Sequence, residues 1–231
     1  DNVWFFPCGN EEGVHSFIQS GMDTLNFSLC YLRTCDAEWL LERFPDMWEV
    51  YREENSDEYI CKISDYLSME GGKYSELRKK IRHLERMYQA ETKEISETTL
   101  GDAYEVLKQW REVQHHVGDK DVEDTDVSEI ALQNREALSL VGSILYLDGK
   151  PIALYAGFPL DSETIDVLIG KCVPEAPNYT VYLAMREFLR QHQGSYLYCN
   201  LEEDLGIPGI RMVKQKMRPM MKHEIWNARR K

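Results

Sequence analysis

The hydrophobic pattern changes its period part-way along the chain, and this change constrains the fold most. In the segment GGKYSELRKKIRHLERMY the apolar residues recur every three or four positions, as on one face of a helix. From residue 141 on, short apolar runs alternate with turns, and Asp148-Gly149 between two such runs is a strong hairpin signal. The pattern therefore predicts a long helix at about 73–90 and, later, a three-stranded antiparallel meander.

Shorter segments complete an alternating order of helices and strands. The other predicted helices lie at 11–20, 37–44, 101–117, 126–138 and 179–192. The predicted strands lie at 3–7, 59–63, 141–147, 152–158, 165–169 and 196–199, with a closing strand within 220–226 and a connector at 47–51. This order predicts an α/β fold built on a mixed sheet.

The charge of the chain is strongly acidic but uneven. The 231 residues carry a net charge of −13, from 27 Lys and Arg against 40 Asp and Glu. Residues 206–231 hold eight Lys or Arg and one acid, Glu224, so the rest carries 19 − 39 = −20. An acidic body disfavours nonspecific contact with nucleic acid or anionic lipid. We expect no stable nucleic-acid binding.

Composition also narrows the class of protein. With 43% hydrophobic and 29% charged residues the chain has a globular composition, and no apolar run approaches the roughly 20 residues that cross a bilayer. The six cysteines form no C-x-x-C pair, so we expect buried free thiols and neither a disulfide framework nor a metal site. The start DNVWFFPCGN does not have the pattern of a signal peptide. A soluble cytoplasmic protein is the expectation.

The segment NLEEDLGIPGIRMVKQKMRP near the C-terminus combines opposite charges. Three adjacent carboxylates, Glu202, Glu203 and Asp204, precede a Gly-Ile-Pro-Gly turn, and cations follow it. These cations are Arg211, Lys214, Lys216 and Arg218. Adjacent carboxylates repel one another unless solvent, cations or a ligand compensate them. Two interpretations stay open: the charges line a shared cleft, or they neutralise each other.

A second group of cations lies at the start of the long helix. Lys73, Arg78 and Lys79 follow the helix breaker Gly71-Gly72, although helix N-termini usually prefer acids. An anion held at that end would account for them, and so would simple solvent exposure.

Several of these blocks resemble a known family. FFPCG, GGKYSELRKKI, LDGKPIALYAG and EEDLGIPGIR are similar to segments of bacterial proteins related to the C-terminal domain of phosphatidylglycerol lysyltransferase. The matching positions are Gly71, Lys73, Tyr74, Arg78 and Ile81, and then Asn200, Glu202, Asp204, Leu205, Gly206, Pro208, Gly209, Arg211, Lys214 and Pro219.

The resemblance implies a GNAT-like fold, a mixed sheet flanked by helices, in two tandem domains joined by a long helix. Residues 1–65 would be the back part of an N-terminal domain whose front half is absent from this chain. Residues 66–231 would form a complete C-terminal domain.

The chain departs from the family pattern in its meander. Gly157-Phe158 replaces a frequent Gly-Glu, Leu168-Ile169-Gly170-Lys171 replaces a His-x-Glu-Lys run, and Lys79 replaces an Asn. The segment 172–178, CVPEAPN, has no glycine and two prolines, unlike a usual GNAT phosphate loop. These departures weaken the expectation of acetyl-CoA chemistry.

The function that the resemblance implies is acyl or aminoacyl transfer. An acyl-CoA or aminoacyl-tRNA donor would bind where two sheet strands diverge, with Arg211 and Lys214 on its phosphates and Lys73, Arg78 and Lys79 as helpers. Glu202 would bind a cationic amine acceptor, and Glu203 and Asp204 would be the catalytic carboxylates.

The alternative is a catalytically degenerate GNAT-fold module that binds a small anion, a peptide or a second copy of the chain. Modification of a membrane lipid is the least favoured interpretation, because phosphatidylglycerol is anionic like the protein body. The donor, the acceptor and the oligomeric state are left open.

Overall fold

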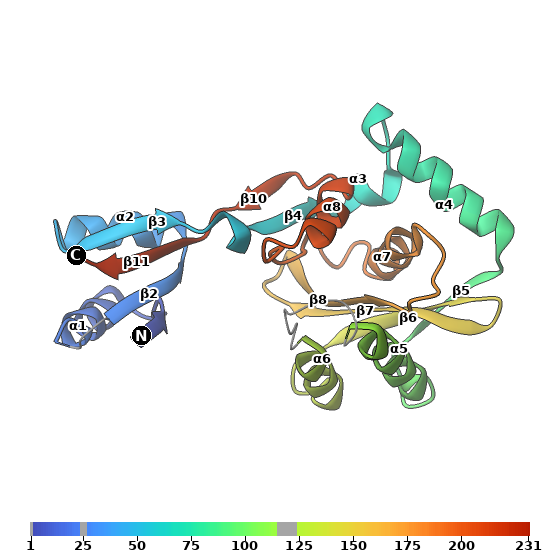
Figure 1. The fold of residues 1–231 in the computed structure, drawn as a ribbon, viewed down its shortest axis with the longest axis horizontal. Helices are drawn as coiled ribbons and strands as arrows, with labels where there is room; N and C mark the ends of the chain where they lie inside the picture. The colour runs from blue at the N-terminus through green and yellow to red at the C-terminus, as the bar shows by residue number, and fades with distance from the viewer. Residues whose placement is uncertain (1, 24–26, 115–123) are drawn as a thin grey trace. The chain divides into compact units, whose positions relative to one another are not determined.

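The computed structural model describes residues 2–23, 27–114 and 124–231. The chain divides into two compact units (Figure 1). The first unit comprises Asp1–Tyr59, Glu203–Arg211 and Met221–Lys231. The second comprises Ile60–Glu202 and Met212–Met220.

The first unit is a small sheet with two helices. The strands β1 (Asn2–Phe5), β2 (Phe27–Leu32), β11 (Trp226–Arg230) and β3 (Trp48–Arg52) follow in that spatial order. β1 is parallel to β2, whereas β11 is antiparallel to both β2 and β3. The helices α1 (Glu11–Gly21) and α2 (Thr34–Arg43) contribute Ile18 and Leu40 to a core that also contains Phe27 and Trp48. A turn η1 (Glu54–Ser56) and the short β10 (Met221–His223) also belong to this unit.

The second unit is built on a larger mixed sheet. The sheet begins with the short β10, followed in space by β4 (Glu58–Lys62), β9 (Tyr198–Asn200), β8 (Thr164–Cys172), β7 (Lys150–Pro159), β6 (Val141–Leu147) and β5 (Ala90–Glu94). From β4 to β5 all neighbours pair antiparallel except β8 and β9, which are parallel. The meander predicted from the sequence is confirmed.

Helices cover both faces of this sheet. α5 (Leu100–Gln114) and α6 (Asp124–Gln133) lie on one face, and α7 (Thr180–Gln191) lies on the other (Figure 1). On the α5 and α6 side, Val106, Leu107 and Leu132 pack with Ile144 and Leu154 of the strands. The remaining elements are α3 (Ile63–Ser68), η2 (Gly72–Tyr74), α4 (Ser75–Met87) and α8 (Pro208–Lys216).

The sequence pattern failed at short elements and at element ends. Residues 47–51, expected as a connector, belong largely to strand β3, and the strands β2 and β5 and the helices α3 and α8 were not predicted. The long helix ends at Met87 because the chain turns into β5 at Ala90. Residues 115–117 of the predicted helix 101–117 lie outside the described residues.

The expected boundary after residue 65 also differs from the two units. Residues 203–211 and 221–231 return to the first unit, where β11 pairs with a strand on each side. The interpretation of the first unit as the back part of a GNAT-like domain stays a prediction. No helix among the described residues is long and apolar enough to span a membrane.

Gly157 in β7 is required by close backbone packing. A Cβ built at this position would lie 2.0 Å from the carbonyl oxygen of Asp166 in β8. Because that atom belongs to the backbone of the neighbouring strand, the strands would have to separate.

We expect Gly157→Ala to lower the free energy of unfolding by about 2–3 kcal/mol, as overpacking does. Gly101→Ala in α5 meets nothing within 4 Å and should raise it by about 0.5–1 kcal/mol. Urea unfolding of both variants tests this, and equal effects would contradict it.

Candidate functional site

Asp204, one of the three adjacent acids, is fully buried in the first unit. Its carboxylate accepts the hydroxyl of Tyr59 at 2.5 Å and two guanidinium bonds from Arg211, at 2.8 and 2.9 Å. The backbone N–H of Gly206 donates a further bond at 2.8 Å. The Arg211 guanidinium, more than the other donors, holds the pKa of Asp204 far below its usual range. A carboxylate so fully bonded is a poor proton acceptor at neutral pH.

Arg211 is occupied by the same network. Besides its two bonds to Asp204, its Nη2 donates to the Asn55 side chain at 2.9 Å. The loop is tied to the same asparagine, because the N–H of Leu205 donates to the Asn55 carbonyl. Of the two interpretations left open by the sequence, mutual neutralisation therefore describes Asp204 and Arg211. A catalytic role for Asp204 and a phosphate contact by Arg211 stay predictions that these contacts do not favour.

The two glutamates have different environments from Asp204. Glu202 has a positive φ of 58°, and its N–H donates to the side chain of Asn200. Glu203 accepts a bond from the hydroxyl of Tyr31 in β2 at 3.3 Å. Both side chains are only partly buried. Glu203 is the better placed of the two predicted catalytic carboxylates.

The cations after the turn lie on a helix that starts at Pro208. Proline suits the first position of a helix, where its missing N–H costs nothing. Lys214 lies in the part of α8 that belongs to the second unit, as does Lys216. Lys216 contacts Glu76 at 3.4 Å and the Tyr179 hydroxyl at 3.3 Å. The predicted pair Arg211 and Lys214 is thus divided between the two units.

The predicted cations of the long helix also have distinct roles. Arg78 donates to the carbonyls of Met69 and Gly71, which lie in a turn with left-handed backbone angles. Arg78 therefore stabilises the start of the helix. Lys73 lies over the ring of Tyr74 at 5.1 Å. Lys79 borders a surface cavity of about 520 Å³ with Ser75, Arg78, Arg82, Glu85 and Arg86, so four cations and one acid surround it.

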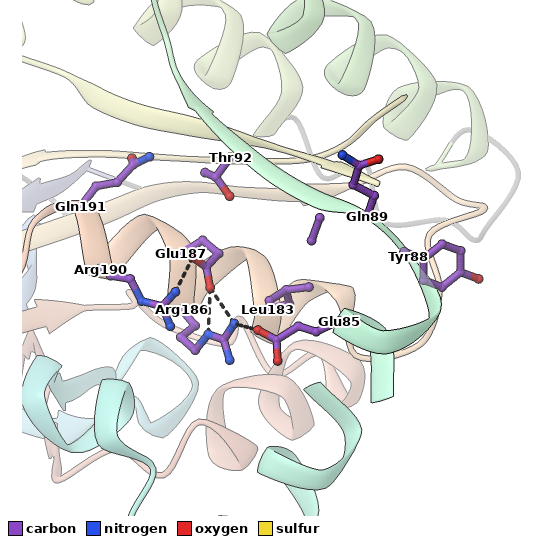
Figure 2. Close-up of a pocket in the computed structure, with 10 residues that line it drawn as sticks. Glu85, Tyr88, Gln89, Thr92, Leu183, Arg186, Glu187, Arg190 and Gln191 are labelled. Carbon is purple, nitrogen blue, oxygen red and sulfur yellow. Dashed lines mark hydrogen bonds and ion pairs between the residues drawn. The ribbon is translucent and has the colours of Figure 1, made fainter. Parts of the chain in front are cut away.

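A second cavity, of about 590 Å³, lies between α4, β5 and α7 (Figure 2). Arg186 of α7 is its central charge and binds both Glu187, at 2.7 Å, and Glu85 of α4. Arg190 binds the other oxygen of Glu187 at 2.9 Å. Two guanidinium groups and two carboxylates thus compensate each other, as the dashed lines in Figure 2 show. None of the residues predicted from the sequence lines this cavity.

The pairing of β8 with β9 is short, because β9 has only three residues. It comprises Thr164 with Tyr198, Ile165 with Cys199 and Asp166 with Asn200, whereas β8 continues to Cys172. The opposite edge of β8 is paired with β7. The donor site between two diverging strands, which the resemblance implies, stays a prediction.

The family follows from comparison with known proteins. The family model for the C-terminal domain of phosphatidylglycerol lysyltransferase matches residues 2–229. The chain belongs to this family. No curated protein matches its sequence. The chain is nevertheless similar to several solved structures.

One of these is a conserved protein of unknown function from Bacteroides thetaiotaomicron, at 24% identity and a TM-score of 0.89 over 99% of this chain and 79% of that one. A second is L-PGS from Bacillus licheniformis, at 16% identity and a TM-score of 0.66 over 98% and 76%. A third is FemX, at 10% identity and a TM-score of 0.62 over 98% and 79%. These likenesses show the fold, a GNAT-like mixed α/β architecture.

Sequence reasoning missed the partners of the predicted residues. Tyr59 and Asn55 precede Asp204 by about 150 residues, and no pattern in the sequence links them. Tyr31 was missed because its strand β2 was missed. Among the residues that the structure describes, no three His, Cys, Asp or Glu side chains come together as a metal site.

The burial of Asp204 predicts a pH-dependent contribution to stability. Because the pKa of the folded state is lowered, this contribution is complete above the unfolded pKa and decreases as the pH falls below about 4. We expect Asp204→Asn to lower the free energy of unfolding by about 3 kcal/mol at pH 7, as for a broken buried ion pair. The difference from the wild type should narrow at pH 3.5.

Urea unfolding at both pH values measures this, with Glu203→Gln as the matched control because its side chain is partly exposed. The control should change stability by less than about 1 kcal/mol. An Asp204→Asn protein as stable as the wild type at pH 7 would show that the fold does not depend on this pair.

Proposed function

We propose that this protein transfers an acyl or aminoacyl group from an activated donor to an amine. The observation that carries the proposal is that β8 extends beyond its pairing with β9 in a GNAT-like sheet. An extended donor could lie along this part of β8 and be held by backbone hydrogen bonds, as an added strand is held. The donor carbonyl would then lie beside the last paired residues, Asp166 and Asn200.

The departures from the family pattern in the meander are compatible with this reaction. Orienting the amine against a polarised carbonyl supplies much of the rate in acyl transfer, so a His or Glu in the sheet is not indispensable. Glu203, in the first unit, is proposed to bind an amine. Asp204 and Arg211 would act by holding the Glu203 loop in place, since they are bonded to each other.

The donor is proposed to be an aminoacyl-tRNA that binds transiently, which is compatible with the expectation of no stable nucleic-acid binding by this acidic chain. Lys79, Arg82 and Arg86 border one cavity along α4, and the stretch of helix from residue 79 to residue 86 is about 10 Å long. Cations spread over that length suit a phosphate backbone better than a single pyrophosphate. The segment before α7 has prolines in place of the glycines of a phosphate loop, which supports the same choice over acyl-CoA.

The alternative is a binding module without catalysis. The observation that favours it is the saturation of Asp204 and Arg211 by each other and by Tyr59 and Asn55. In this alternative the basic side of α4 still binds an anion, but no group is transferred.

Binding of charged tRNA to α4 can be tested by its salt dependence. We expect the triple variant Lys79→Gln/Arg82→Gln/Arg86→Gln to bind a pool of aminoacyl-tRNA more weakly. The slope of log K against log salt should fall by about 2, since each phosphate contact contributes about 0.7 on single strands. The control Lys62→Gln/Lys108→Gln/Lys150→Gln removes the same charge from exposed positions and should leave the slope unchanged.

Transfer itself is measured with radiolabelled aminoacyl-tRNA or acyl-CoA and a mixture of amine acceptors. Labelled product from aminoacyl-tRNA, reduced in the α4 variant and retained in the control, is the expected outcome. Binding without product for any donor would favour the module. Neither binding nor a shift in melting temperature with either donor would exclude the transferase.

A further inference from the structure

Strand β2 contains a tyrosine in a conformation that strands rarely tolerate. Tyr31 has a φ of 56°, in the left-handed region that side chains other than glycine usually avoid. The cause is a bulge in the pairing with β11, where Trp226 pairs with Leu32 but Ala228 pairs with Leu29. Two residues of β2, Cys30 and Tyr31, therefore oppose Asn227 alone. A bulge of this kind redirects the side chain that it carries.

The bulge is stabilised by the residue opposite. The side-chain oxygen of Asn227 accepts the backbone N–H of Tyr31 at 3.3 Å, which compensates the bond that the ladder loses there. A strained residue that its surroundings hold in place points to a role beyond folding.

The redirected side chain reaches the predicted functional loop. The hydroxyl of Tyr31 donates to Oε1 of Glu203 at 3.3 Å, a long bond for two oxygens. The ring of Tyr31 lies 5.4 Å from that of Phe5, and both rings are exposed, Tyr31 by 39% and Phe5 by 70%. A carboxylate next to exposed aromatic faces is the chemistry that recognises an alkylammonium group.

We propose that Tyr31 positions Glu203, and that the two residues, with the ring of Phe5, bind the ammonium group of the acceptor. That the bound amine is the acceptor of a transfer reaction rests on the proposed function. The binding of an ammonium group, in contrast, involves the first unit alone. All these residues belong to that unit. The aromatic faces contact the cation, the carboxylate compensates its charge, and the Tyr31 hydroxyl fixes the direction of the carboxylate.

The state of the Tyr31 hydroxyl agrees with this role. Partial burial, followed by the negative charge of Glu203 and its hydrogen bond, raises the pKa of Tyr31 to about 12. Glu58 and the thiol of Cys30 act in the same direction. The hydroxyl therefore stays protonated and remains a donor to Glu203 at any physiological pH.

The contact between Tyr31 and Glu203 is tested without any substrate. The protein is labelled with ¹³C at the tyrosine Cζ, and the Tyr31 resonance is followed by NMR as the pH is raised, which gives the pKa of Tyr31. Circular dichroism defines the pH range in which the fold is intact. Glu203→Gln should lower the pKa of Tyr31 towards 10, whereas Glu42→Gln, an exposed acid of α2, should not change it. An unchanged Tyr31 resonance in Glu203→Gln would overturn the inference.

Binding is tested with n-butylammonium and its neutral analogue n-butanol, by chemical-shift changes at Tyr31 and Phe5. The wild type should bind the cation and not the alcohol. Tyr31→Phe, which keeps the ring, should weaken binding about fivefold, the effect of one hydrogen bond. Phe5→Leu should weaken it about threefold, the effect of one exposed cation–π contact, and Glu42→Gln should bind like the wild type. Equal binding of cation and alcohol, or no effect of Tyr31→Phe, would contradict the proposal.

Failure of this inference and failure of the proposed function give different results. A Tyr31–Glu203 contact and ammonium binding without any transfer would leave the subsite in place and remove the transferase. Transfer that persists in Tyr31→Phe with an unchanged KM for the amine would retain the transferase and remove the subsite.

Discussion

The buried carboxylate of Asp204 organises the functional end of this chain. A charge removed from water must be compensated by close partners, and here the guanidinium of Arg211, the hydroxyl of Tyr59 and the N–H of Gly206 provide them. These bonds fix the loop 203–211 against residues 55–59 of the first unit. The same bonds use up the charges of Asp204 and Arg211. In contrast to Asp204, Glu203 in the same loop is only partly buried.

The family and the fold do not by themselves identify a reaction for this chain, so its function has to be argued from individual side chains. The chain belongs to the family of the phosphatidylglycerol lysyltransferase C-terminal domain and has a GNAT-like sheet in which β8 extends beyond its pairing with β9. The sheet does not carry the His and Glu that the family pattern suggested at the meander. The proposed function therefore rests on the edge of β8 beyond β9, the cations of α4 and the carboxylate of Glu203 beside Tyr31.

Several charged residues hold neighbouring parts of the fold together. Arg78 bonds to the carbonyls of a turn in which Met69 and Gly71 have positive φ, and Arg186 joins α7 to α4 through Glu85. Tyr31 differs from these residues, because its own backbone has a conformation that is unfavourable in a strand. The side chain of Asn227 stabilises that conformation by accepting the backbone N–H of Tyr31. Only the contacts in the structure distinguish the residues that stabilise the backbone from those that are candidates for binding a ligand.

The sequence by itself determined whether each long element is a helix or a strand, through the period of its hydrophobic pattern. The stripe of α4, the meander from Val141 to Cys172 and helix α7 were predictable because their signals are local, within one face or one hairpin. The sequence also identified the segment 200–219 and its family. Only the tertiary structure decided which charges there compensate each other, because Tyr59 and Asn55 are distant in sequence. It also decided that β11 completes the first unit, since a five-residue strand is specified by its two neighbours and not by its own pattern.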